Sequence, residues 1–141
     1  MTLDLERLMS LWDVPPGPDA EAEFAGLYAD PFVLNGASTP VSALVAMSRG
    51  LHAAVAGQRR EILDVLTAGP DRVAVAFVVR GRHVGPLPSR LGTVPPTGRD
   101  VEMSVIDLFT LSGGRITEVR AVSDELGMLI GLGAAGPGTQ P

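Results

Sequence analysis

The 141-residue chain contains no cysteine, which excludes disulfide bonds, thiolate metal ligands and a cysteine nucleophile. Aromatic residues make up only 4% of the chain, so its core must be filled mainly by aliphatic side chains and methionine. Charged residues are also scarce, at 19%, whereas hydrophobic residues reach 45%. This composition indicates a compact globular protein rather than a disordered one.

Basic charge and long apolar runs are lacking as well. The net charge of −5 removes the electrostatic attraction on which nucleic-acid binders depend. No apolar run approaches the ~20 residues that a membrane span needs, and the acidic residues within segment 1–12 are unlike a secretory signal. We therefore expect neither a nucleic-acid nor a membrane partner, and a cytoplasmic location.

The length fits one domain, which we expect to span residues 1–132. Residues 133–141 are rich in glycine and proline, a composition typical of a disordered tail. No internal repeat or linker divides the remaining chain. A single fold must therefore account for the function.

Helical spacing dominates the first part of the chain. Apolar residues in segment 5–12 share one helical face, and we expect Trp12 to be a core residue. A second predicted helix includes Tyr28 and ends at Pro31. A third predicted helix precedes Gly57, which stands where a C-terminal cap is expected.

The second part of the chain has the alternation and turn residues of antiparallel strands. Strands are predicted at 61–67, 72–84, 100–111 and 115–123. A Gly-Pro-Asp turn at 69–71 joins the first two, and the Pro- and Gly-rich segment 85–98 is predicted to be an irregular loop over a sheet edge or cavity mouth. Asp124 is a candidate N-cap of a last short helix. Helices followed by a meander predict an α+β fold in which helices cover one face of a curved sheet and enclose a cavity.

A set of short motifs occurs in a particular order along the chain. These are Tyr28-Ala29-Asp30, Asn35, GRHVG (81–85), PPTGR (95–99), GGRI (113–116), Arg120, Asp124 and a Leu-Gly ending. In this order and spacing the chain resembles the SnoaL-like polyketide cyclases of the NTF2-like superfamily. The resemblance implies a SnoaL-like cone, with N-terminal helices packed on a curved, mainly antiparallel sheet. It further implies a hydrophobic, polyketide-like substrate, no cofactor and a homodimer.

The chain departs from this family at the position of its base. In the aldol cyclases that it resembles, an aspartate directly after the strand arginine is the general acid/base, and a histidine on the neighbouring strand helps to bind substrate. The matching residues here are Ala121 and Asp107. If Ala121 faces the cavity, strand alternation is expected to turn Asp107 into it as well. Burial would raise the pKa of Asp107 and allow it to exchange a proton near neutrality.

The candidate site residues follow from the motifs and the strand alternation. Asp107 and His83 are the candidate catalytic residues, and the candidate substrate-binding residues are Tyr28, Asn35, Phe77, Met103, Val105, Arg120 and Ala121. Structural interpretations stay open, since Asp107 can pair with Arg120 or Arg99, and Asn35 can be a turn residue before Gly36. Two histidines in separate segments give no metal-site signal, and no glycine motif indicates a nucleotide.

The preferred function is a cofactor-independent cyclase that forms a ring in a polyketide-like intermediate of secondary metabolism. Asp107 would supply acid/base help, or else the cavity would shape a pericyclic, [4+2]-type cyclisation by lowering the entropic part of the barrier. One alternative is a non-catalytic protein that binds a hydrophobic small molecule. Another is an epoxide-opening cyclase or hydrolase, although the aspartate/arginine/aspartate set of the hydrolases is incomplete here.

Overall fold

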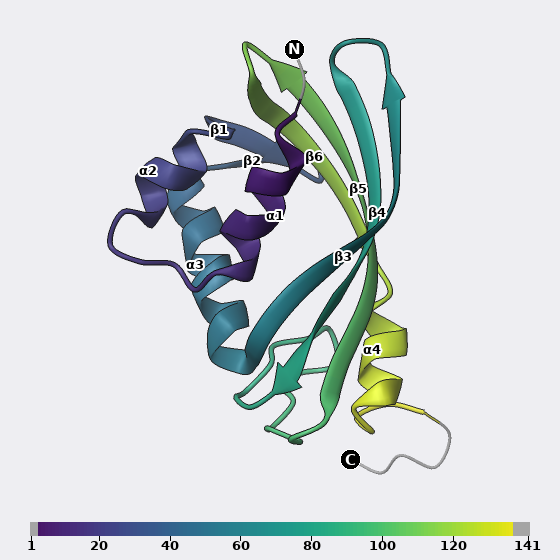
Figure 1. The fold of residues 1–141 in the computed structure, drawn as a ribbon. Coiled ribbons are helices and arrows are strands. Elements are labelled where there is room, and N and C mark those ends of the chain that lie inside the picture. Colours follow the sequence, from purple (N-terminus) through teal and green to yellow (C-terminus); the bar gives the residue numbers. More distant parts are fainter. Residues whose placement is uncertain (1–2, 137–141) are drawn as a thin grey trace.

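A computed structural model describes residues 3–136, and residues 137–141 of the expected tail lie outside the described part. The described chain contains four helices and six strands (Figure 1). In chain order they are α1 (Leu5–Asp13), α2 (Ala20–Ala25), β1 (Tyr28–Leu34), β2 (Ala37–Thr39), α3 (Val41–Ala54), β3 (Val55–Ala68), β4 (Arg72–His83), β5 (Asp100–Ser112), β6 (Arg115–Ser123) and α4 (Glu125–Gly131).

The strands form one curved sheet in the order β2-β1-β6-β5-β4-β3. All neighbours are antiparallel except β1 and β6, which are parallel. Helices α1, α2 and α3 lie on the concave side of the sheet, and α4 lies apart from them beside the beginning of β5 (Figure 1). The expected α+β fold, with N-terminal helices on a curved and mainly antiparallel sheet, is confirmed.

Residues of α1 close one side of the main core. Asp4 caps the helix, because its carboxylate accepts a hydrogen bond from the backbone N–H of Arg7 at 3.1 Å. The helical spacing turns Leu8 and Met9 toward the sheet, where both are buried. Trp12 at the end of α1 packs edge-on against Phe24 of α2, with ring centroids 5.3 Å apart. The expected first helix is confirmed, and it covers the concave face.

Two helix boundaries differ from the expected ones. The second helix ends at Ala25, and Tyr28 begins β1, which runs through Pro31; pairing with β6 overrides the helical spacing in this segment. The third helix ends at Ala54, and Gly57 lies inside β3 with a φ of +63°. The β3–β4 register shifts beside this glycine, so its positive φ serves a bulge and not a helix cap.

Alternation along the strands gives the sheet two unlike faces. On β5 the buried Val105 and Phe109 point toward α1–α3, on what is here called the inner face. Glu102 and Ile106 point the other way, to the outer face, and are exposed.

Within residues 3–136, no helix is long and apolar enough to cross a membrane.

The segment after β4 belongs to a second, smaller core. Leu87 and Val94 form an isolated bridge across the predicted loop, and both side chains are buried in a cluster with α4 and Val101 at the beginning of β5. Asp124 caps α4 as expected, by accepting a hydrogen bond from the N–H of Gly127 at 2.8 Å. The loop therefore closes the end of the sheet that lies away from α1.

Candidate active site

An apolar cavity of about 140 Å³ lies between α1 and the inner face of the sheet. This inner cavity is lined by Leu8, Met9 and Trp12 of α1, Tyr28 of β1, Arg60 of β3, Phe77 and Val79 of β4, and Met103, Val105, Asp107 and Phe109 of β5. Its volume is similar to the roughly 150 Å³ of an engineered apolar cavity that holds benzene. The inner cavity thus has room for about one six-membered ring.

Asp107 is the carboxylate of this cavity. It lies in the middle of β5, opposite Val75 on one side and Ala121 on the other. Its Oδ1 atom is buried and has no hydrogen-bond partner among the described residues. Burial raises the pKa of Asp107 to about 6, although the positive charge of Arg60 acts in the opposite direction. A carboxyl group with this pKa can both accept and donate a proton near neutrality.

Arg60 brings a positive charge to the same cavity. Its guanidinium Nη1 donates to Oδ1 of Asp13 at 2.8 Å, and its backbone N–H donates to Oδ2 of Asp13 at 3.3 Å. The guanidinium also lies over the ring of Trp12, 5.7 Å from the centroid. Only 6% of the Arg60 side chain is exposed. Asp13 and Trp12 therefore hold this buried cation in one place.

Tyr28 contributes a hydroxyl group. The hydroxyl accepts a hydrogen bond from Nε1 of Trp12 at 3.0 Å, so its own proton remains available for donation. Burial raises the pKa of Tyr28 above its usual range, and the phenol stays protonated at neutral pH. The backbone carbonyl of Trp12 accepts a hydrogen bond from Nε2 of His52 on α3 at 2.8 Å, which fixes the end of α1. The inner cavity thus combines one carboxyl, one guanidinium and one phenol on apolar walls.

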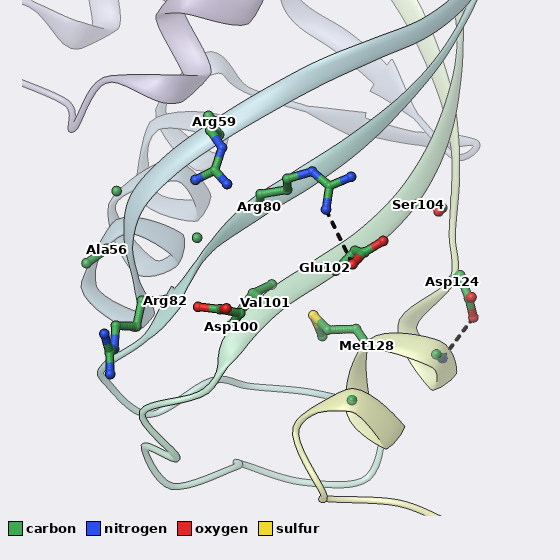
Figure 2. Close-up of a pocket in the computed structure, with 14 residues that line it drawn as sticks. Ala56, Arg59, Arg80, Arg82, Asp100, Val101, Glu102, Ser104, Asp124 and Met128 are labelled. Atoms are coloured by element: carbon green, nitrogen blue, oxygen red, sulfur yellow. Dashed lines mark hydrogen bonds and ion pairs between the residues drawn. The ribbon is translucent and has the colours of Figure 1, made fainter.

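A larger hollow of about 620 Å³ lies on the outer face, beside α4 (Figure 2). Its charged lining residues are Arg59, Arg80, Arg82, Asp100, Glu102 and Asp124. Arg80 donates to Glu61 at 3.1 Å and pairs with Glu102 at 3.3 Å, so acidic and basic groups offset one another here. Water also screens these exposed charges. The smaller inner cavity is therefore the better candidate active site, because its carboxyl group is half-buried and has one buried oxygen with no hydrogen-bond partner among the described residues.

The model of one protein family, SnoaL-like polyketide cyclase, matches residues 6–132. The chain belongs to the SnoaL-like polyketide cyclase family. Solved structures agree on the fold: TsrD from Streptomyces laurentii is 20% identical with a TM-score of 0.77, over 93% of this chain and 92% of that one. No curated protein matches the sequence significantly.

Two further structures show the same SnoaL-like fold. IdmH from Streptomyces antibioticus is 24% identical with a TM-score of 0.72, over 92% of this chain and 95% of that one. A SnoaL-like polyketide cyclase from Agrobacterium tumefaciens is 17% identical with a TM-score of 0.69, over 89% and 94% of the two chains. At these identities the likeness concerns the fold, and the chemistry must be argued from the site.

Ala121, at the position of the family's base, lies directly opposite Asp107 on the inner face of this SnoaL-like sheet. It is half-buried and packs against the main core, but it does not line the inner cavity. Its backbone N–H donates to Oδ1 of Asn35 at 2.8 Å. Asp107 and Ala121 thus share a face, as the strand alternation predicts, but only Asp107 reaches the cavity.

Asn35 and Arg120 do not reach the inner cavity. Asn35 is exposed in the β1–β2 turn, with a φ of +48°, and its side chain ties this turn to β6. Arg120 points to the outer face, where 63% of its side chain is exposed and it pairs with Glu118 at 3.5 Å. Asn35 fits its structural interpretation as a turn residue, whereas Arg120 pairs with Glu118 and not with Asp107. The family resemblance placed them in the site because sequence order does not distinguish the two faces.

His83 is fully buried, but at the other end of the sheet. Its Nδ1 lies 2.9 Å from Oγ1 of Thr97 and accepts a hydrogen bond from the Thr97 backbone N–H at 3.2 Å. Val75 lies opposite Asp107, and the eight residues from there to His83 span about 26 Å along β4. His83 therefore anchors the loop after β4 and does not share a site with Asp107.

The sequence analysis did not identify Arg60 as the cation of the inner cavity, or α1 as part of the cavity wall. For Trp12 the sequence favoured a core position over a cavity-lining one; it packs against the core and also lines the inner cavity, where it contacts both Arg60 and Tyr28. One signal for Arg60 was available, because adjacent strand residues point to opposite faces and the Arg59–Arg60 pair must send one side chain inward.

Within residues 3–136, no group of three or more His, Asp or Glu side chains is placed to hold a metal ion.

Proposed function

We propose that this SnoaL-like protein is a cofactor-independent cyclase that closes a ring in a polyketide-like intermediate, with Asp107 as the proton-transfer group. The observation that carries the proposal is a carboxyl group with a buried, unpartnered oxygen in an apolar cavity. Such a group destabilises the folded protein unless a ligand completes it. The family to which the chain belongs supports a cyclisation as the reaction.

The reaction is an intramolecular aldol-type closure. The Asp107 carboxylate takes a proton from a carbon beside a carbonyl group, and the C–H electron pair forms an enolate. The enolate carbon then attacks a second carbonyl carbon in the same chain, and the new C–C bond closes the ring. Asp107 returns its proton to the resulting alkoxide oxygen. No electrons leave the substrate, so this chemistry requires no redox cofactor.

The cavity volume supports entry of the reacting unit alone. Its 140 Å³ lies below the roughly 300–1,000 Å³ of pockets that enclose a drug-sized ligand. We therefore propose that one ring-sized segment of the substrate enters, beside the apolar side chains of Phe77, Met103 and Val105. Holding this segment in a folded conformation lowers the entropic part of the barrier.

Replacing the carboxyl group tests the proposal. The substrate is the linear precursor that accumulates when the gene is deleted from its host, and product is followed by mass spectrometry. We expect Asp107→Asn to lower turnover by about 10²–10⁴-fold, the range for general acid/base catalysis. Asp100→Asn is the matched control, because Asp100 lies on the same strand but lines the exposed outer hollow. It should leave turnover unchanged.

The same pair of variants separates the competing mechanisms. A pericyclic, [4+2]-type closure needs no proton transfer, so Asp107→Asn would keep most of its turnover. A non-catalytic binding protein would bind the precursor and return it unchanged in both variants and in the parent protein. Either result would remove Asp107 from the chemistry.

We also propose that the protein forms a homodimer through the outer face. Three large apolar side chains are exposed there: Leu66 at 66%, Ile106 at 57% and Val122 at 72%. Exposed apolar residues grouped on one sheet face favour contact with another protein surface. Sedimentation velocity should find a dimer, and Val122→Glu should convert it to a monomer. A monomeric parent protein would contradict this proposal.

A further inference from the structure

Arg60 has more hydrogen-bonding capacity than its partners use. A guanidinium group carries five N–H donors, and Asp13 is the only hydrogen-bond partner that the described residues give to this one. Its side chain is almost fully buried and lines the inner cavity. The remaining donors therefore belong to a nearly buried side chain in the cavity wall, where a ligand in the cavity can accept from them.

Tyr28 offers a second donor in the same cavity. Because its oxygen accepts from Nε1 of Trp12, its proton points elsewhere. Trp12 touches both groups, since its ring also lies under the Arg60 guanidinium. Trp12 thus contacts a phenol and a guanidinium that two different strands, β1 and β3, bring to the wall of the same cavity.

We propose that Arg60 and Tyr28 form an oxyanion subsite, which receives the oxygen of an enolisable ketone in a unit no larger than one six-membered ring. This inference rests on the proposed function and names the substrate class of the same cavity. As Asp107 removes the proton beside the carbonyl group, the carbonyl π electrons move onto the oxygen. Fixed donors at that oxygen stabilise the enolate more than the neutral ketone, which is the condition for acceleration.

The Asp13–Arg60 pair suits this role. Without Asp13, the Arg60 guanidinium would be an unpaired buried charge. With carboxylates on all its N–H groups, it would have no donor left for a ligand. Oδ1 of Asp13 accepts a hydrogen bond from only one guanidinium nitrogen, and Oδ2 accepts from the backbone N–H of Arg60. Asp13 is thus a positioning residue that holds Arg60 without saturating it.

A binding measurement without turnover tests the subsite. The probe is cyclohexane-1,3-dione, a one-ring diketone that is largely its enolate in neutral water, and cyclohexanone is the neutral probe of equal ring size. The Asp107→Asn protein is titrated, because its neutral amide stands for the carboxyl group that already holds the proton. The readout is the indole N–H resonance of Trp12, the only tryptophan in the chain, which donates to Tyr28.

We expect the loss of Arg60 to weaken binding of the dione selectively. Adding Arg60→Met should weaken dione binding about tenfold or more, as expected for removing a charge-assisted hydrogen bond, and change cyclohexanone binding less than threefold. Arg60→Lys should restore part of the affinity. Tyr28→Phe, which keeps the ring and removes only the donor, should weaken the dione severalfold. Arg80→Met on the outer face should change neither probe.

Each of the other results is decisive. If Arg60→Met unfolds the chain, Asp13→Ala/Arg60→Met removes both charges together, and Tyr28→Phe tests the second donor alone. Equal dione binding with and without Arg60 overturns the subsite, as does binding of cyclohexanone but not of the dione; the proposed proton transfer by Asp107 survives both. If neither ring moves the Trp12 resonance, the inner cavity is not a ligand site and the proposed function fails with the subsite.

Discussion

Two carboxylates on β5 lie on opposite faces of the sheet and have opposite surroundings. Glu102 on the outer face is exposed and pairs with Arg80 at 3.3 Å. Asp107 on the inner face has a buried oxygen with no hydrogen-bond partner among the described residues. The exposed carboxylate therefore has an ion-pair partner, whereas the half-buried one has an oxygen atom without a hydrogen-bond partner. This difference is the reason for proposing that the chemistry takes place on the inner face.

The largest expected effect compares two neighbours on β5. Phe109 is buried in the core beside the inner cavity, whereas Leu108 is half-buried on the outer face. Phe109→Ala should lower the free energy of unfolding by about 3–5 kcal/mol, because it leaves a void that the core fills only partly. Leu108→Ala should cost about 1 kcal/mol or less. Urea unfolding measures both, and equal losses would contradict the division into inner and outer faces.

The second prediction is that a substitution, Asp107→Asn, stabilises the folded protein, whereas most substitutions destabilise it. The folded-state pKa of Asp107, about 6, lies above its ordinary value of 3.8, so the folded protein binds this proton more tightly than the unfolded chain. Stability from this group is therefore present below about pH 4 and is lost as pH rises through about 6. Asp107→Asn should match the parent protein near pH 4 and exceed it by about 1–3 kcal/mol at pH 8.

The control for this reversal is Glu102→Gln on the outer face. Removing an exposed and paired carboxylate should not stabilise the protein at any pH. Urea unfolding at pH 4, 6 and 8 follows both variants. A gain for Glu102→Gln equal to that for Asp107→Asn would show that net charge, rather than burial, is responsible.

The third prediction puts a carboxylate back where the family has its base. Ala121→Asp places a second acid directly opposite Asp107 on the inner face, with Cβ atoms about 5 Å apart. The two charges repel at neutral pH, so we expect a loss of about 1–2 kcal/mol at pH 8 and a smaller loss at pH 4. Ser104→Asp, on the exposed outer face of β5 and outside the proposed dimer patch of Leu66, Ile106 and Val122, should show no such pH dependence in thermal melting.

The smallest expected effect lies wholly on the outer face. Arg80→Gln breaks the exposed ion pairs with Glu61 and Glu102. Exposed pairs contribute little and are screened by salt, so the melting temperature should fall slightly in dilute buffer and not at all in 1 M salt. A large fall that persists in salt would mean that the outer charges support the fold as strongly as the inner core does.

Local patterns in the sequence predicted most of the fold. Helical spacing gave α1, alternation and turn residues gave the meander β3–β6, and strand alternation placed Asp107 on the same face as Ala121. These features depend on residues close together in sequence or on one strand. The boundaries of α2 and α3 were wrong because pairing with distant strands set them, for Tyr28 through β6 and for Gly57 through a bulge.

The site itself was predicted only in part, because it depends on contacts between segments far apart in the chain. Asp13, Tyr28 and Arg60 come together only after the sheet curves and α1 packs on it. A register shift in β3 also hides which residues of that strand face inward. The motif GRHVG (81–85) led to the opposite error, because its His83 was predicted to be catalytic but holds the loop after β4.

The state of the Asp107 carboxyl group tests the account most directly. In protein labelled with ¹³C at the aspartate carboxyl carbons, resonances are followed from pH 3 to pH 9 in the parent protein and in Asp107→Asn. We predict one aspartate signal that titrates near pH 6 and is missing from the variant. If the signal that disappears in Asp107→Asn titrates near pH 4 or below, the carboxyl group is not isolated in an apolar cavity, and it loses its claim to the proton-transfer role.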